Sequence, residues 1–184
     1  MMTTATSALD LVPDSLETDT KPENLREFLQ QLVAGGFIDS GLSQSAEPIA
    51  KSGKLISDLA AKCLSSSFVT WSHRMTSEYV DRFGTQWLRE NRLPELLLGS
   101  RIGSTALATA LADRSGKELL PITFQQVGDK YLIDGVIPWA SNLYPDTLVI
   151  FAAREPETGE RKLFAAELSF AGVSVKPAEG LLAL

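Results

Sequence analysis

The sequence predicts an α+β fold in which an amino-terminal helical domain is followed by an antiparallel, β-barrel-like domain. Over residues 22–99, apolar residues recur every three or four positions, which is typical of amphipathic helices. From residue 100 onward they alternate every second position between turn residues, which indicates short strands. Helices followed by strands, without alternating βαβ units, favour two consecutive domains.

The helical half is expected to begin at Pro22, because proline suits the first turn of a helix, and this first helix is expected to stop at Gly35 and Gly36. A second helix is predicted over residues 49–64 and a third over residues 68–83. Short helical segments should follow near residues 85–88 and 94–98. The hydroxyls of Ser65, Ser66 and Ser67 are candidates to cap the third helix, and Gly84 is expected to end it.

The β half should consist of short strands joined by tight turns. Gly128 and Asp129 suit a two-residue hairpin turn, and Asp134 with Gly135 gives a second turn signal. The strands are predicted over residues 102–109, 122–127, 130–134, 136–140, 147–154, 162–168 and 173–175.

Composition narrows the function classes. The chain has 184 residues, 44% of them hydrophobic and 22% charged, with a net charge of −6. These values are ordinary for a soluble globular protein, and the acidic balance argues against nucleic acid or an anionic membrane as the partner. No stretch approaches the roughly 20 apolar residues of a membrane helix, and no signal peptide is apparent, so we expect a cytoplasmic protein.

The scarcity of histidine and cysteine argues against a metal site. The chain has one of each, His73 and Cys63, ten positions apart and without a carboxylate at ligand spacing. Cys63 lies on the apolar side of its predicted helix and is interpreted as a core residue. His73 is interpreted as a partly buried helix residue bonded to a neighbour, with a ligand-facing role as the alternative.

The most informative stretch is GDKYLIDGVIPWASNLYPDTLVIFAA, residues 128–153. Trp139, Ser141 and Asn142 stand where one predicted strand runs out. A hydrophobic ring beside a hydroxyl and an amide suits a planar heteroaromatic ligand. The alternative is that Trp139 is a core residue and that Ser141 and Asn142 are turn residues.

Residues 57–153 resemble the amino-terminal and middle domains of the acyl-CoA dehydrogenase family of flavoproteins. DLAAKCLSSSFVTWSH is similar to the family's helix pair, and LPELLLGSRIGSTALAT to its approach to the first middle-domain strand. GDKYLIDGVIPWASN is similar to its hairpin ending in W-I-[TS]-N. The resemblance implies FAD, rather than FMN, as cofactor and the oxidation of an acyl-CoA across its α and β carbons by hydride transfer to the flavin.

The same resemblance implies which residues bind the flavin. Trp139 matches the family's tryptophan near the isoalloxazine ring, Ser141 the hydroxyl residue near the reactive flavin nitrogen, and Ala140 the position between them. TALADRSG, residues 109–116, falls where the family has T-E-P-x-x-G-S-D, so Thr109 and Ser115 are the implied contacts there. The glutamate, proline, glycine and aspartate of that motif are replaced, which implies an altered substrate or an altered flavin site.

The family's third, helical domain, which supplies the catalytic base and most of the oligomer interface, is expected to be absent from this chain. The predicted organisation is a flexible segment over residues 1–21, a helical domain over 22–100 and an incomplete β domain over 101–184. No catalytic base is assigned, and a homodimer or homotetramer is expected for the full-length protein. An incomplete sheet would leave unpaired edges.

Two other functions stay open at this point. One is a flavin-dependent monooxygenase on the same scaffold, in which His73 has a functional role. The other is a non-catalytic subunit that uses the fold to bind a partner chain, which the altered residues 109–116 and the missing third domain favour.

Overall fold

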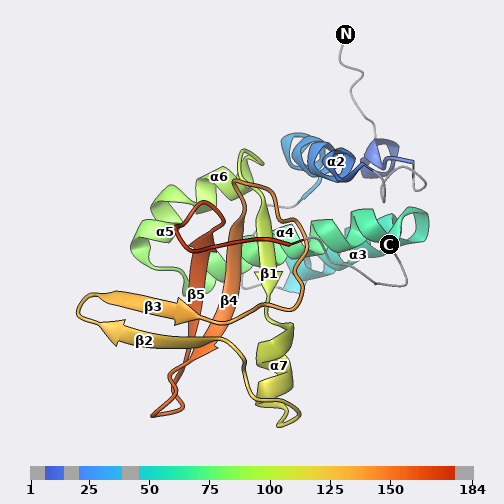
Figure 1. Ribbon diagram of the computed structural model, residues 1–184. Coiled ribbons are helices and arrows are strands. Elements are labelled where there is room, and N and C mark those ends of the chain that lie inside the picture. The colour runs from blue at the N-terminus through green and yellow to red at the C-terminus, as the bar shows by residue number, and fades with distance from the viewer. Residues whose placement is uncertain (1–6, 15–20, 39–45, 177–184) are drawn as a thin grey trace.

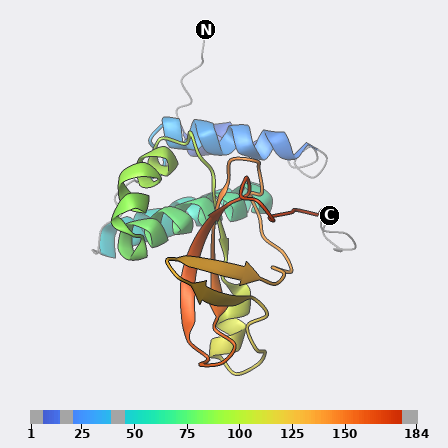
Figure 2. The same cartoon turned by 60° about the vertical axis from the view of Figure 1, so that its left-hand side comes forward.

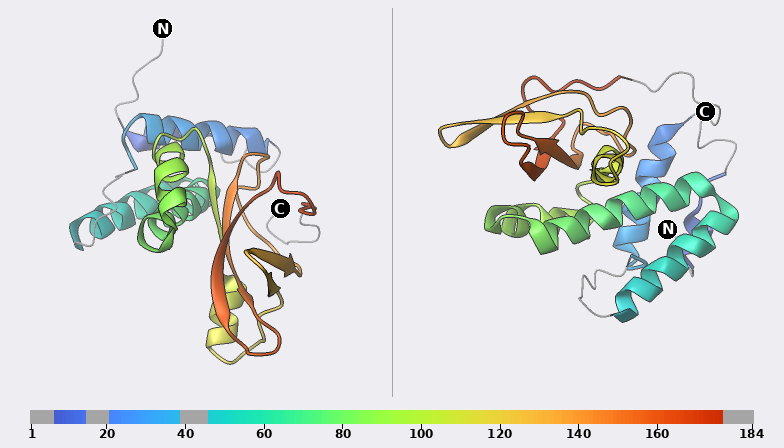
Figure 3. Two further views of the ribbon diagram at one scale, coloured as in Figure 1. Left: turned by 90° about the vertical axis from the view of Figure 1, so that its left-hand side faces the viewer. Right: turned by 90° about the horizontal axis from the view of Figure 1, so that it is seen from below.

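The computed structural model describes residues 7–14, 21–38 and 46–176, with the helices gathered on one side of the sheet (Figure 1; Figure 3, left). The helical elements are η1 Ala8–Leu11, α2 Pro22–Ala34, α3 Ala46–Lys62, α4 Leu64–Phe83, α5 Gln86–Asn91, α6 Leu93–Leu97 and α7 Ala108–Arg114. The strands are β1 Gly103–Ala106, β2 Thr123–Val127, β3 Lys130–Asp134, β4 Leu148–Arg154 and β5 Arg161–Glu167.

The predicted helices are present, but α4 begins earlier than expected. Its N-cap is Cys63, whose Sγ accepts a hydrogen bond from the Ser66 backbone N–H at 3.5 Å. The three serines expected to cap this helix therefore lie inside its first turn. Cys63 is both cap and core residue, with 6% of its surface exposed. Thr85 caps α5 through the N–H of Leu88, and Gly84 ends α4.

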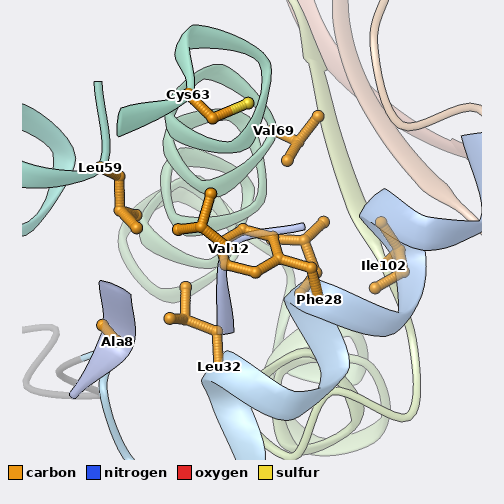
Figure 4. Close-up of a cluster of buried hydrophobic side chains, with 9 residues drawn as sticks. Ala8, Val12, Phe28, Leu32, Leu59, Cys63, Val69 and Ile102 are labelled. Carbon is orange, nitrogen blue, oxygen red and sulfur yellow. The ribbon is translucent and has the colours of Figure 1, made fainter. Parts of the chain in front are cut away.

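The helices pack around an apolar cluster that includes Phe28 and Leu32 of α2 and Leu59 of α3 (Figure 4). Ala8 and Val12 join this cluster from the amino-terminal side, and η1 is closed by a capping box between Ser7 and Asp10. Residues 8–12, inside the segment expected to be flexible, thus contact the helical core. The rest of that segment lies largely outside the described residues.

The sheet is open and mixed, which corrects the antiparallel, barrel-like prediction. β4 pairs with β1 in parallel and with β5 antiparallel, and β2 meets β4 in parallel where Thr123 faces Arg154. β2 and β3 form the predicted hairpin. Within the described residues β3 pairs only with β2, and β5 only with β4, so the strands do not close into a barrel (Figures 1 and 2).

The common direction of β1 and β2, which both run parallel to β4, has a local cause in the chain between them. Residues 102–109 were predicted as one strand, but the strand ends at Ala106 and helix α7 follows. This helix returns the chain so that β2 runs in the same direction as β1, which two-residue hairpins cannot achieve. Residues 173–175, also predicted as a strand, have no regular structure.

Three kinds of contact join the helices to the sheet. Apolar side chains of α4, α6 and β4 form a shared cluster of Val80, Leu96, Leu148 and Ile150. The Arg26 guanidinium of α2 makes two 2.7 Å hydrogen bonds to the Asp146 carboxylate just before β4. Strand β1 lies directly on α4, and a Cβ added at Gly103 would come within 2.6 Å of the Thr76 Cβ. Only glycine permits this approach.

Candidate functional site

The segment between β3 and β4, residues 135–147, carries three of the five predicted flavin contacts. It contains no strand, although residues 136–140 were predicted to form one. Gly135 has a φ of 137°, and a Cβ there would lie 2.8 Å from the Ile122 Cα. This close approach turns the chain away from the hairpin, and Pro138 lacks the N–H that a strand ladder needs.

Asn142 fastens this segment to the helical half. Its side-chain Nδ2 donates to the Val69 carbonyl of α4 at 2.9 Å and to the Gly103 carbonyl of β1 at 3.0 Å. Its backbone takes a φ of 59°, which asparagine tolerates better than most residues. The Thr147 hydroxyl donates to the Asn142 carbonyl. Asn142, which was predicted as either a ligand residue or a turn residue, is thus a buried structural anchor.

Trp139 belongs to an exposed group of three aromatic rings, which we call the aromatic surface: Phe68 and Trp71 of α4, and Trp139. The Phe68 and Trp71 rings stack with centroids 5.5 Å apart, and the Phe68 and Trp139 rings are tilted at 6.5 Å. Their exposed fractions are 39%, 38% and 53%. Because the three rings contact one another, they form a contiguous exposed apolar patch, and such patches are typical of surfaces that bind a ligand or partner. The core interpretation of Trp139 is therefore wrong.

Ala140 and Ser141 follow Trp139 directly. Ala140 is half-buried and packs against the apolar core of the sheet, which fixes the chain beside Trp139. Ser141 is half-buried between that packed residue and the Asn142 anchor. Trp139 and Ser141 therefore lie on a short segment that Ala140 and Asn142 attach to the rest of the protein.

Thr109 and Ser115 lie on helix α7 instead of on a loop. Thr109 is half-buried in the first turn, while Ser115 is the exposed C-cap, with its hydroxyl donating to the Ala112 carbonyl at 2.8 Å. The sequence between them lacks the proline and glycine that would open this helix. The structure brings Trp139, Ala140 and Ser141 together on one segment and puts Thr109 and Ser115 on another element.

The carboxylate of Asp113 holds α7 against the sheet. It accepts hydrogen bonds from the Leu120 N–H at 3.2 Å and from the guanidinium of Arg161 on β5. The hydrogen bond from Arg161 holds the pKa of Asp113 below its usual range. Asp113 is therefore a structural ion-pair residue within the altered 109–116 segment.

His73 is inside the protein, with 1% of its surface exposed. Its Nδ1 accepts a hydrogen bond from the Gly103 N–H at 3.0 Å, so the neutral ring carries its proton on Nε2. Burial lowers the pKa of His73 from 6.5 to about 4, against an opposing effect of a hydrogen bond with the Leu96 backbone. The structural interpretation of this residue is confirmed.

Neither a metal site nor a membrane helix is found where the chain is described. Over residues 7–14, 21–38 and 46–176, no three histidine, cysteine or carboxylate side chains are grouped closely enough to hold a metal ion. Over the same residues no helix has the length and apolar character to cross a membrane.

Sequence reasoning missed Phe68 and Trp71. Both lie on α4, three positions apart, in the stretch SSSFVTWSHRMTS, where most other residues are small and polar. Two large rings on the same side of an otherwise polar helix were a usable signal, because residues at i and i+3 share a face. What the sequence could not show is that Trp139 would lie next to them.

The chain matches no family model. It is 24% identical over 164 residues to the acryloyl-CoA reductase (NADH) of Anaerotignum propionicum, a match that covers 85% of this chain and 41% of the reductase. Among solved structures, it is similar to glutaryl-CoA dehydrogenase from Mycobacterium smegmatis, with a TM-score of 0.69 and 17% identity. It is also similar to PigA, solved with FAD and proline, with a TM-score of 0.68 and 19% identity.

Each structural match covers 90% of this chain and 46% of the solved chain. The chain therefore spans less than half the length of the proteins that it matches. The structural similarity confirms the fold that the sequence resemblance implied: residues across most of this chain adopt the fold of the acyl-CoA dehydrogenase family.

Proposed function

We propose that this chain contributes the flavin-facing wall of an FAD-dependent oxidoreductase that acts on CH–CH bonds of acyl-CoA-like substrates. The observation that carries the proposal is the aromatic surface, in which Trp139 is exposed two residues before Ser141, on an acyl-CoA dehydrogenase-type fold. A planar ring system is the ligand that such a surface binds best. When two aromatic rings stack, apolar surface of both is buried, and few polar groups lose their contact with water.

The residues of the segment 135–147 fit a flavin. Trp139 would cover the isoalloxazine ring and exclude water, and the Ser141 hydroxyl would donate a hydrogen bond to it. Ala140, packed against the sheet, would fix the spacing of these two groups. The bound flavin would supply the hydride acceptor or donor. The protein's part is orientation and stabilisation of charge on the ring.

The two implied flavin contacts at helix α7, Thr109 and Ser115, differ in what flavin binding would require of them. For Thr109 and Ser115 to contact the flavin, as the resemblance implies, the Ser115 hydroxyl would exchange its bond to the Ala112 carbonyl for a ligand atom. The first turn of α7 offers Thr109 without such an exchange. Contacts of Thr109 and Ser115 with the flavin are part of the proposal. Substituting each residue and measuring FAD binding tests these contacts separately from Trp139.

The direct test is reconstitution with FAD of the protein expressed from its natural reading frame. We expect a bound flavin absorbance spectrum that survives desalting. Trp139→Leu should weaken FAD binding about tenfold or more, because it removes a stacked ring. Trp87→Leu, which removes an exposed ring on α5, is the matched control and should bind FAD normally. Absence of bound flavin in the unaltered protein would overturn the proposal.

The direction of the reaction and the substrate are separate proposals. One matched protein is named as an NADH-dependent reductase and another as a dehydrogenase, both acting on CoA thioesters. We propose an acyl-CoA substrate and a homo-oligomeric full-length protein on that basis. Reduction of the bound flavin by a panel of acyl-CoA thioesters, followed by absorbance, would identify the substrate class.

The alternative function, a flavin-dependent monooxygenase, was based in part on a functional role for His73. His73 is buried, and its Nδ1 is occupied by the Gly103 N–H, so it is not placed to act on a ligand at the aromatic surface. The alternative of a non-catalytic subunit predicts a folded protein that binds no flavin, which the reconstitution experiment distinguishes.

A further inference from the structure

The aromatic surface combines side chains from two parts of the chain that are far apart in sequence. Phe68 and Trp71 come from α4 in the helical half, and Trp139 comes from the connection between β3 and β4. Phe68 is the middle ring of the three. It stacks on Trp71 with an interplanar angle of 29° and meets Trp139 at 38°.

The backbone near Trp139 does little to fix the direction of its side chain. The segment has no ladder hydrogen bonds at residues 136–140, and 53% of the Trp139 surface is exposed. An indole in this setting has several rotamers open to it. The Phe68 ring lies next to the indole, with the two ring centroids 6.5 Å apart.

The neighbouring residue of α4 supplies a second point of attachment. Asn142, three residues after Trp139, donates a hydrogen bond to the carbonyl of Val69, the residue next to Phe68. The 139–142 segment is thus joined to one turn of α4 through a ring contact at one end and an amide at the other. Trp71, one turn further along the same face, stacks on the Phe68 ring with the centroids 5.5 Å apart.

We infer that Phe68 is a positioning residue that holds the Trp139 ring in the orientation needed to stack on a flavin, so that the helical half sets the geometry of a wall carried by the β half. This inference rests on the proposed function for the identity of the ligand. The positioning itself is a property of the ligand-free protein and is tested there first.

The first experiment uses a protein in which Trp139 is the sole tryptophan, made by Trp71→Phe and Trp87→Phe, without flavin. Adding Phe68→Leu should increase acrylamide quenching of the Trp139 fluorescence and lower its anisotropy, because the ring is released. Phe68→Tyr, which keeps the ring, should restore both signals. Quenching and anisotropy unchanged by Phe68→Leu would overturn the inference whether or not flavin binds.

The second experiment measures FAD affinity by titration in the otherwise unaltered protein. Phe68→Leu should raise the Kd about threefold to tenfold, the range expected for one aromatic pair. In a Trp139→Leu background the same change should raise the Kd less than about twofold, because there is no ring left to position. Phe83→Leu, an exposed ring at the end of the same helix, is the control and should leave the Kd unchanged.

The two experiments separate the possible failures. A Phe68→Leu effect that is undiminished in the Trp139→Leu background would overturn positioning, since Phe68 would then act on the ligand by itself. Loss of FAD binding by the unaltered protein would defeat the proposed function, while increased quenching in the first experiment would still support the positioning of Trp139. Circular dichroism and urea unfolding of each variant confirm that it is folded.

Discussion

Helix α4 packs small polar side chains on β1, whereas its amino-terminal turns carry large aromatic rings, one of which meets Trp139. Ser72 and Thr76, which pack on β1, are fully buried. Phe68 and Trp71, in the turns before them, are more than a third exposed. At this place the small polar residues are inside and the large apolar ones are outside, unlike the usual amphipathic helix.

Three hydroxyl groups of this buried polar region, those of Thr70, Ser72 and Thr76, each make a hydrogen bond. The Thr76 hydroxyl donates to the Ser72 carbonyl at 2.9 Å, and Thr70 donates to the Ser66 carbonyl at 2.7 Å. The Ser72 hydroxyl in turn accepts from the Thr105 N–H of β1 at 3.1 Å. Because these side chains are short, the strand can approach the helix closely.

The largest effect is expected from a substitution that disrupts the close packing of β1 on the small polar residues of α4. Gly103→Val should lower the free energy of unfolding by about 3 kcal/mol or more, because its Cβ would lie 2.6 Å from that of Thr76. Urea unfolding followed by circular dichroism measures this. Gly53→Ala in α3, where a Cβ meets nothing within 4 Å, should instead raise stability by about 0.5–1 kcal/mol. Equal effects of the two substitutions would contradict the close-approach argument.

The next largest effect is expected at Asn142, which joins the 135–147 segment to α4 and β1. Asn142→Ala removes two buried hydrogen bonds, to Val69 and Gly103, and should lower the free energy of unfolding by about 2 kcal/mol. Asn91→Ala removes one exposed hydrogen bond to Trp87 and should change stability by less than about 0.5 kcal/mol. Thermal unfolding of both variants makes the comparison. A loss at Asn91 as large as that at Asn142 would show that burial does not matter here.

A pH dependence tests the buried histidine of α4. Since burial lowers the pKa of His73 from 6.5 to about 4, the unfolded state binds more protons than the native state between these values. The free energy of unfolding should therefore fall as the pH drops below about 6.5, by up to about 1.4 kcal/mol per pH unit. Urea unfolding between about pH 7 and about pH 5 measures the slope, because carboxylates with lowered pKa values, such as Asp113, respond at lower pH.

The control for this slope is His73→Gln, which retains an acceptor for the Gly103 N–H but cannot titrate. His73 is the only histidine in the chain, so the substitution should flatten the dependence between these pH values. A slope unchanged by the substitution would mean that another group is responsible.

The smallest effect on stability is expected at the aromatic surface. Trp71→Leu should change the free energy of unfolding by less than about 1 kcal/mol, because the ring is already 38% exposed. Leu59→Ala in the helical core, where the side chain is fully buried, should cost about 2–5 kcal/mol by comparison. If Trp71→Leu destabilises the protein as much as Leu59→Ala, the aromatic rings serve the fold and not a ligand.

The helix periodicity and the Gly128–Asp129 turn were readable in the sequence because they depend on neighbouring residues. α2 and the β2–β3 hairpin therefore lie where they were predicted. The prediction failed where a distant contact decides the local structure. Residues 136–140 have strand-like composition, but Gly135 turns the chain against Ile122 and Asn142 fastens it to α4. α7 replaces part of a predicted strand because helix-forming residues stand where the related motif has proline and glycine.

The candidate site was predictable in part. Trp139, Ala140 and Ser141 could be proposed together because they are consecutive and match a short motif. Phe68 and Trp71 could not be joined to them, since about 70 positions separate the two groups and no local rule spans that distance.

By itself the sequence determined the helical first half, the β-rich second half and the motif around Trp139, because periodicity, turn residues and short motifs act locally. Only the tertiary structure decided that the sheet is open and mixed, that small polar side chains of α4 are buried against β1, and that Trp139 joins the two aromatic rings of α4. Those features depend on how closely β1 approaches α4 at Gly103 and on where Asn142 fastens the chain, and both are contacts between residues far apart in sequence.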